Sequence, residues 1–199
     1  GSSAVALAIQ NVASVGDNIV ASPQLYGGTY NLFVNTLRNM GIEVRFAEPS
    51  TSKSFQKLTD GRTRAYFGET LPNPRLVPFP IAEVAEIGRE RGIPLIVDNT
   101  AAPITCRPIE HGAAVVVHSL TKYIGGHGNS IGGVIIDSGQ FDWVVHSQQQ
   151  PHFNNPDSSY HGAVWGELVP QALGASIAFA VRARVVLLRD LGSALSPTN

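Results

Sequence analysis

The feature that most constrains the fold is a regular alternation of short apolar runs, rich in Val and Ile, with segments of helical periodicity. Strands are predicted over residues 18–21, 43–46, 63–67, 94–98, 114–118 and 133–137. Helices are predicted over residues 4–9, 29–40, 54–58, 81–91, 108–111 and 172–191. This alternation favours a mixed, mostly parallel sheet with helices on both faces, an α/β fold. In such folds the functional loops lie at the carboxyl ends of the strands.

Two segments carry more detailed expectations. The helix predicted over 29–40 has an apolar face made of Leu32, Phe33, Thr36, Leu37 and Met40. The polar, turn-rich segment Ser147–Ser159 predicts a surface loop.

Composition narrows the classes of partner and the compartment. Hydrophobic residues make up 43% of the 199 residues and the formal net charge is −1, so nucleic acid and acidic membrane surfaces are not expected partners. Small molecules or copies of the same chain are expected instead. No signal segment or membrane-length apolar run is present, and the single cysteine, Cys106, favours a reducing compartment; we expect a cytoplasmic protein. The chain starts at Gly1 without Met and ends just after a helical pattern, so we expect a fragment of a longer protein.

Reactive side chains gather where predicted strands end. Asp98 closes the apolar run Pro-Leu-Ile-Val, and the next strand leads into His-Ser-Leu-Thr-Lys, which ends at Lys122. Parallel strands place these groups at neighbouring positions on one edge of the sheet. Lys122 is followed by the glycine-rich stretch 125–128, whereas Lys53 and Lys57 lie on a polar segment. If Lys122 is desolvated, its amine loses its proton more easily and becomes a nucleophile towards carbonyls; the alternative is a solvated loop lysine.

These residue types match the needs of a pyridoxal-phosphate (PLP) site. Such a site needs a lysine that forms a Schiff base, an acid beside the pyridine nitrogen and donors for the phosphate, often with a stacked aromatic ring. The chain offers Lys122, Asp98, Ser119, Thr121, Tyr26 and a helix start at Gly1 and Ser2.

Longer motifs extend the match to a known family. The chain contains, in order, YGGTY (26–30), ETLPNP (69–74), VDNT (97–100) and HSLTKYIGGHG (118–128). Together they resemble the Cys/Met-metabolism family of PLP enzymes, which have the aspartate-aminotransferase-like fold, also called fold type I. The stretches 107–112, 139–143 and 160–165 are most similar to those of O-acetylhomoserine sulfhydrylases.

The resemblance implies a role for each candidate residue. Lys122 would bond to the cofactor and later carry protons, and Asp98 would hold the pyridine nitrogen protonated. Tyr26 would stack on the ring and assist catalysis, and Asn73 would hydrogen-bond the phenolic oxygen. The phosphate would be held by Ser119, Thr121, Gly1 and Ser2. Each has a simpler alternative: Tyr26 as a packed turn residue, Asp98 as a cap, Asn73 as a turn residue and the hydroxyls as ordinary strand ends.

The resemblance also implies an activity and an assembly. Residues 1–199 would be the large PLP-binding domain of a homotetramer, a dimer of dimers with shared active sites. The reaction would be γ-replacement on O-acetylhomoserine by sulfide or a thiol, giving homocysteine or methionine and acetate. Members of the family are about twice as long as this chain. The N-terminal segment that supplies a Tyr and an Arg to a neighbouring subunit, and the C-terminal domain with the substrate-carboxylate arginine, are not in it.

Other readings remain open at this stage. Within the family, O-succinylhomoserine sulfhydrylase, cystathionine γ-synthase and methionine γ-lyase share every residue named, and a truncated, non-catalytic PLP-binding protein is also compatible. Residues 128–132 match the G-x-S-x-G pattern of serine hydrolases around Ser130, but a strand rather than a helix is predicted next. No third glycine completes a dinucleotide motif, and no two of the 6 histidines lie at i, i+4 spacing, so no metal site is expected.

Overall fold

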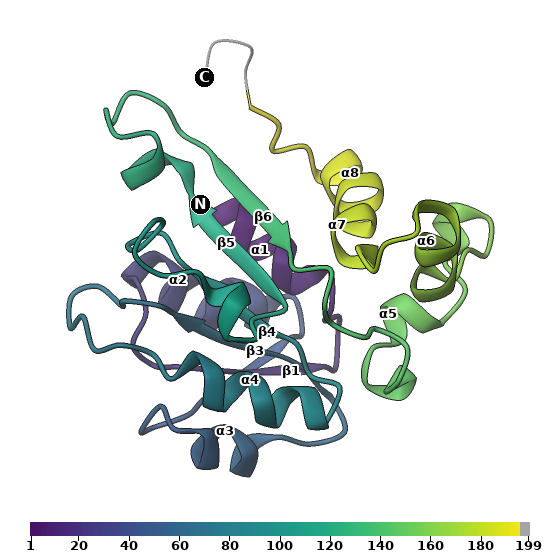
Figure 1. Cartoon of the computed structure of the whole chain (residues 1–199), viewed down its shortest axis with the longest axis horizontal. Coiled ribbons are helices and arrows are strands. Elements are labelled where there is room, and N and C mark those ends of the chain that lie inside the picture. Colours follow the sequence, from purple (N-terminus) through teal and green to yellow (C-terminus); the bar gives the residue numbers. More distant parts are fainter. Residues whose placement is uncertain (196–199) are drawn as a thin grey trace.

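The central element of the fold is a six-stranded sheet with the order β2-β1-β3-β4-β5-β6 (Figure 1). The computed structural model describes residues 1–195; the last residues, 196–199, lie outside the described part. The strands are β1 (Asn18–Ala21), β2 (Glu43–Phe46), β3 (Thr63–Glu69), β4 (Leu95–Asp98), β5 (Val115–Ser119) and β6 (Gly133–Asp137). All neighbouring pairs are parallel except β5 and β6, which are antiparallel. The predicted mixed, mostly parallel α/β fold is therefore confirmed.

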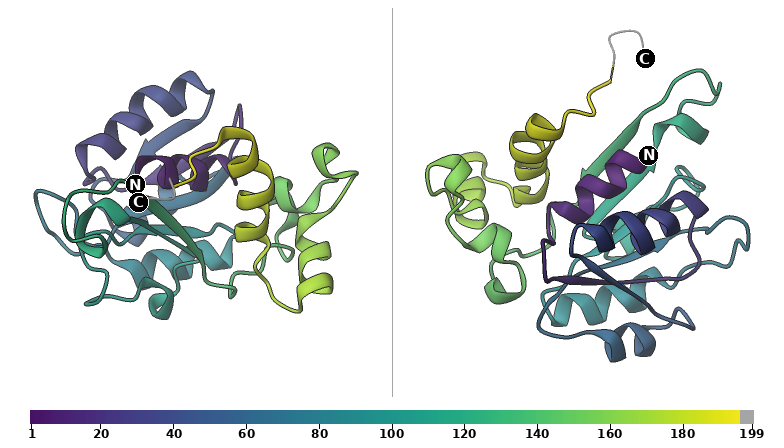
Figure 2. Two further views of the ribbon diagram at one scale, coloured as in Figure 1. Left: turned by 90° about the horizontal axis from the view of Figure 1, so that it is seen from above. Right: turned by 180° about the vertical axis from the view of Figure 1, so that it is seen from behind.

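Helices cover both faces of the sheet, and each face has its own core. On one face lie α1 (Ser2–Gln10), α2 (Gly27–Asn31) and its π-helical continuation η1 (Leu32–Leu37) (Figure 2). On the other lie α3 (Ser52–Leu58) and α4 (Ile81–Glu90), whose Phe55 and Val84 pack on Val20 and Val97. The short 3-10 helix η2 (Pro108–His111) leads into β5. Since both faces are covered, the central strands are buried along nearly their whole length, as parallel strands in α/β proteins usually are.

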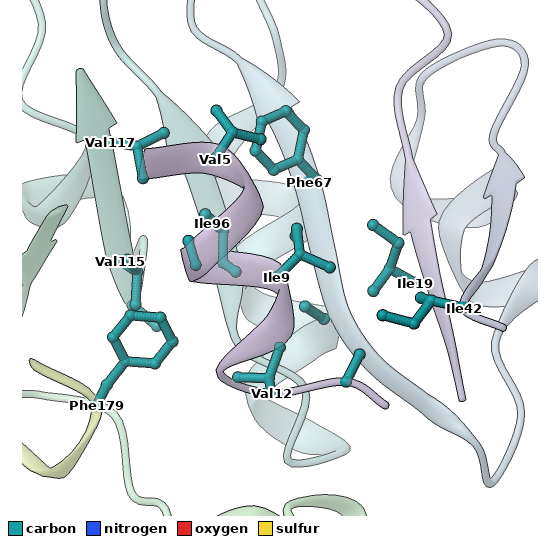
Figure 3. Close-up of a cluster of buried hydrophobic side chains, with 14 of the residues drawn as sticks. Val5, Ile9, Val12, Ile19, Ile42, Phe67, Ile96, Val115, Val117 and Phe179 are labelled. Carbon is teal, nitrogen blue, oxygen red and sulfur yellow. The ribbon is translucent and has the colours of Figure 1, made fainter. Parts of the chain in front are cut away.

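Helix α1 is the centre of the larger core. Its Val5, Ile9 and Val12 belong to one buried cluster with Phe67 and Ile96 of the sheet (Figure 3). The helix is buried on most of its surface because helices from the C-terminal part, including Phe179 and Val186, pack on it as well. An all-apolar sequence such as AVALAI suits a helix with neighbours on several sides.

The predicted long helix over 172–191 is wrong. The structure has α6 (Trp165–Leu173), a break at residues 174–177, then α7 (Ala178–Arg182), η6 (Ala183–Leu188) and α8 (Arg189–Leu191). Gly174 ends α6 with a positive φ of 65°, a conformation that glycine adopts without strain. No single helix in residues 1–195 has the length and apolarity to cross a membrane, although α6 and the helix after it, bent by 106°, meet that test as a pair.

Two further expectations needed correction. The segment 147–159 is not simply a surface loop, because it contains η4 (Ser147–Gln149), α5 (Pro151–Asn154) and the start of η5 (Ser158–Tyr160). Its Gln150 and Phe153 are buried, and the Gln150 side chain donates to the backbone carbonyls of Arg64 and Gly92. In the helix over 29–40, Phe33 and Leu37 are buried as expected. Thr36 and Met40 are exposed, because the sheet contacts a narrower stripe of this helix than the pattern suggested.

Candidate active site

The candidate site is a cavity at the carboxyl edge of β3, β4 and β5, on the face that α1 covers. Strand alternation sets this placement: Phe67, Ile96 and Val117 point into the α1 core, and the next residues of the same phase are Glu69, Asp98 and Ser119. The cavity has a volume of about 880 Å³. All eight residues predicted for the site line it, namely Gly1, Ser2, Tyr26, Asn73, Asp98, Ser119, Thr121 and Lys122.

Asp98 presents a partly buried carboxylate to this cavity. The backbone N–H of Thr100 donates to Oδ1 at 2.9 Å, and the Thr100 hydroxyl donates to the same oxygen at 2.5 Å. Within residues 1–195 no side-chain hydrogen bond uses Oδ2, so that oxygen is available to a ligand. Burial raises the pKa of Asp98, and the two hydrogen bonds from Thr100 oppose that rise because they favour the ionised form.

Thr100 joins two strand ends and was not singled out in the sequence. Its hydroxyl donates to Asp98 and accepts from the backbone N–H of Ser119 at 2.8 Å. One oxygen thus fixes the end of β5 relative to the acid at the end of β4. Its position two residues after a strand-end aspartate, where an Asx-type turn forms, was the available signal.

Lys122 follows β5 in a distorted turn. The segment η3 (Leu120–Ile124) contains a kink at Lys122, where φ is −98° and ψ is −118°. The side chain lines the same cavity as Asp98. Of the two alternatives left open for Lys122, the structure has the solvated one, because the residue is exposed where it lines the cavity.

The start of α1 lies at the edge of the cavity and has the chemistry that an anion site needs. Gly1 is the N-cap and contributes no side-chain cap, so α1 directs unsatisfied N–H groups and the positive end of its dipole towards the carboxyl edge of the sheet. A Cβ at Gly1 would lie 2.7 Å from Cβ of Ser119, so the start of α1 packs tightly against the end of β5. The four predicted phosphate ligands, Gly1, Ser2, Ser119 and Thr121, therefore lie together.

Two of these four groups already have partners within the chain. The Gly1 nitrogen donates to the carbonyl of Gly132 at 2.8 Å, and the Thr121 hydroxyl donates to the same carbonyl at 3.3 Å. Thr121 also accepts from the Gly132 N–H at 3.1 Å. Ser2 and Ser119 are thus better placed than Gly1 and Thr121 to serve a phosphate without rearrangement.

Tyr26 and Asn73 lie on loops that follow β1 and β3. Tyr26 is 51% exposed and its ring borders the cavity. Gly28 permits this, because a Cβ there would collide with the Tyr26 ring. Asn73 is exposed on the loop after β3 and lines the cavity as well.

Glu69 is the second residue that sequence reasoning missed. It is 6% exposed and lines the cavity beside Asp98. The predicted strand ended at Phe67, whereas β3 continues to Glu69, so its position at a strand end was not seen. Burial raises the pKa of the Glu69 carboxyl to about 7, and the charge of Asp98 adds to the rise.

The serine-hydrolase pattern does not have the required geometry. Ser130 lies in a loop that leads directly into β6, with no helix after it. A nucleophile elbow needs a strand before the serine and a helix behind it. The structure therefore gives no support to Ser130 as a nucleophile.

The fold and the cavity together define an α/β protein with an amine, an acid and an uncapped helix start at one sheet edge. This donor set fits pyridoxal phosphate: an amine to bond its aldehyde, a carboxylate for its ring nitrogen and N–H groups for its phosphate.

Comparisons with known proteins also point to a protein that binds pyridoxal phosphate. Residues 1–199 match the family described as Cys/Met metabolism PLP-dependent enzyme, and the chain belongs to that family. An O-acetyl-L-homoserine sulfhydrylase of Leptospira meyeri is 48% identical over 204 residues, covering 100% of this chain and 46% of that protein. A homocysteine/cysteine synthase of Saccharomyces cerevisiae is 44% identical over 199 residues, covering 99% of this chain and 44% of that protein.

A solved structure gives the same result for the fold. A Campylobacter jejuni protein described as an O-acetylhomoserine (thiol)-lyase superposes with a TM-score of 0.92 at 38% identity, covering 100% of this chain and 48% of that one. That structure contains a pyridoxyl-lysine monophosphate residue. The chain spans about half the length of the curated relatives it matches.

Proposed function

We propose that this chain forms the large, cofactor-binding domain of an O-acetylhomoserine sulfhydrylase. The observation that carries the proposal is that Lys122, Asp98 and the start of α1 border one cavity. Relatives aligned over the full chain include proteins named O-acetyl-L-homoserine sulfhydrylase, which supports O-acetylhomoserine as the substrate. The net reaction replaces acetate at Cγ with sulfide: the Cγ–O bond breaks, a C–S bond forms, and homocysteine and acetate leave. A thiol such as methanethiol would give methionine.

Each residue of the cavity would have a separate role. Pyridoxal phosphate, when bound, supplies an electron-withdrawing ring that stabilises negative charge at the substrate's Cα. Lys122 would hold the cofactor through Nζ and move the proton at Cα. Oδ2 of Asp98 would keep a proton on the ring nitrogen, while Thr100 orients the carboxylate through Oδ1. The Tyr26 ring would cover one side of the cavity and Asn73 would donate to the phenolic oxygen.

The phosphate would be held at the corner where α1 meets β5. Ser2 and Ser119 are the residues we assign first, because the Gly1 nitrogen and the Thr121 hydroxyl already donate to Gly132. The dipole of α1 favours a dianion at this position, which anchors one end of the cofactor while Asp98 orients the other.

We further propose that copies of this chain assemble into a homotetramer in the cytoplasm. The open rim of the cavity supports association, because exposed apolar side chains such as Tyr123 and Leu76, 70% and 58% exposed, border it. A free Cys106 and no second cysteine support a reducing compartment.

The test is product analysis with O-acetylhomoserine in the presence and absence of sulfide. Homocysteine formed only with sulfide supports the proposal, whereas 2-oxobutanoate and ammonia formed without sulfide would identify a γ-lyase instead. Lys122→Ala should abolish turnover and leave any cofactor removable by dialysis. Lys57→Ala, which changes an exposed lysine on α3, is the matched control and should keep wild-type turnover. Normal turnover by the Lys122→Ala variant would overturn the assignment.

A further inference from the structure

The cavity contains a second acid, Glu69, which has no role in the proposed function. Glu69 ends β3 and pairs in register with Asp98, which ends β4. Adjacent residues in register on neighbouring strands point to the same face of the sheet. Two carboxyl groups therefore lie side by side under α1, and Glu69 is the more buried of them, with 6% of its surface exposed.

Glu69 contacts the two loops that carry the cofactor-facing side chains. The backbone N–H of Tyr26 donates to Oε1 of Glu69 at 2.7 Å. The backbone of Asn73 also hydrogen-bonds the Glu69 carboxyl group. Tyr26 is the N-cap of α2, and its carbonyl accepts the N–H of Tyr30 at 2.9 Å. Glu69 thus fixes the backbone at the point where the Tyr26 loop becomes a helix.

We propose that Glu69 is a positioning residue, whose carboxyl group holds the Tyr26 loop in place through the backbone N–H of Tyr26. The inference rests on the proposed function, since the position of the Tyr26 ring matters only if that ring faces a cofactor. Glu69 would touch no reacting atom, because it acts through the backbone of Tyr26.

The surroundings of Glu69 favour its neutral form. No cationic side chain in residues 1–195 forms a salt bridge or hydrogen bond with it. Besides Glu69, the titratable groups that line the cavity are Tyr26, Asp98, Lys122, Tyr123 and the Gly1 amine. Burial is the main cause that raises the pKa of Glu69 to about 7, the Asp98 charge raises it further, and the Tyr26 and Asn73 hydrogen bonds oppose both. Repulsion between the two neighbouring carboxylates also disfavours the state in which both are ionised.

The first test measures amide hydrogen exchange at Tyr26 in the protein freed of cofactor. Glu69→Leu removes the acceptor and should speed Tyr26 exchange by about tenfold or more, because a partly buried N–H loses its partner. Glu69→Gln keeps a neutral acceptor of the same shape and should retain protection within about threefold of wild type. Glu86→Leu, which changes an exposed acid on α4, is the control. Exchange at Tyr26 in the Leu variant equal to that in wild type would overturn the proposal.

The second test is a ¹³C NMR titration of the glutamate carboxyl groups in wild type and in Glu69→Gln. The signal absent from the variant should titrate near pH 7, and titration near the ordinary value of 4.5 would refute the neutral form. If Glu69→Leu does not fold, Glu69→Ala takes its place in the exchange test, since it also removes the acceptor.

Turnover separates this proposal from the proposed function. In the loaded enzyme, Glu69→Leu should lower kcat and Glu69→Gln should restore it. A wild-type protein that does not convert O-acetylhomoserine would defeat the proposed function, while the exchange and titration results would still decide the role of Glu69.

Discussion

Thr100 offers the sharpest test of how the two strand ends are held together. Thr100→Val replaces the hydroxyl with a methyl group of nearly the same shape. It removes the 2.5 Å bond to Asp98 and leaves the Ser119 N–H, previously 2.8 Å from the hydroxyl oxygen, without an acceptor. A hydrogen bond to a charged group contributes about 1.5–3 kcal/mol and an ordinary one about 1 kcal/mol, so the free energy of unfolding should fall by about 3 kcal/mol.

The assay is urea denaturation of the cofactor-free protein, with the midpoint shifted and the slope unchanged. Thr100→Ser keeps the hydroxyl and should stay within about 1 kcal/mol of wild type. The loss in Thr100→Val also depends on pH, because the lost bond favoured the ionised Asp98 and its removal raises the pKa of Asp98 further. The folded variant holds that proton more tightly than folded wild type, so the difference is full at neutral pH and shrinks on acidification through the Asp98 pKa. A valine variant as stable as the serine variant would refute the bridge.

Two further predictions concern β3. Gly68→Ala should lower the free energy of unfolding by about 1–3 kcal/mol in thermal denaturation, because its Cβ would lie 2.6 Å from the buried Phe79 ring; Gly61→Ala, with nothing within 4 Å, is the control that should match wild type. For Glu69, whose folded pKa of about 7 lies above the ordinary 4.5, folded wild type binds a proton more tightly than the unfolded chain in that interval. Wild type should therefore lose stability relative to Glu69→Gln as pH rises from 4.5 to 7, by up to about 3 kcal/mol, and a difference constant with pH would contradict the shift.

Most of the sheet could be predicted from sequence because each strand is short, apolar and bounded by clear turn residues. Three strands, over 18–21, 43–46 and 133–137, were predicted to the residue. The break within the predicted helix over 172–191 could not be predicted in the same way. Apolar residues continue on both sides of it, and its local sign is a single glycine, Gly174. Propensity does not report the packing of α6 and α7, which meet at a sharp bend.

Candidate site residues were predicted where a chemical requirement singled them out. They were missed where their contacts are hydrogen bonds to distant backbone. A lysine and an acid at strand ends are visible in a sequence as reactive groups, and Lys122 and Asp98 do border one cavity. Thr100 and Glu69 act by hydrogen bonding to backbone that is distant in sequence, 19 residues away for Ser119 and 43 for Tyr26. The sequence left open whether Lys122 is buried or solvated, since that depends on how distant segments pack around the cavity.

The core and the site are connected through one property of the strands, the phase of their alternation. Phe67 and Ile96 point into the cluster around α1. Glu69 and Asp98 lie two residues further along the same strands, so they point to the same face of the sheet. A shift of one residue in β4 would bury Asp98 towards α4 and remove the acid from the cavity. The same apolar residues that hold α1 on the sheet therefore aim the carboxyl groups at its N-terminus. For this reason the site can be polar without weakening the core: its charged groups begin where the strands end and the apolar contacts with α1 stop.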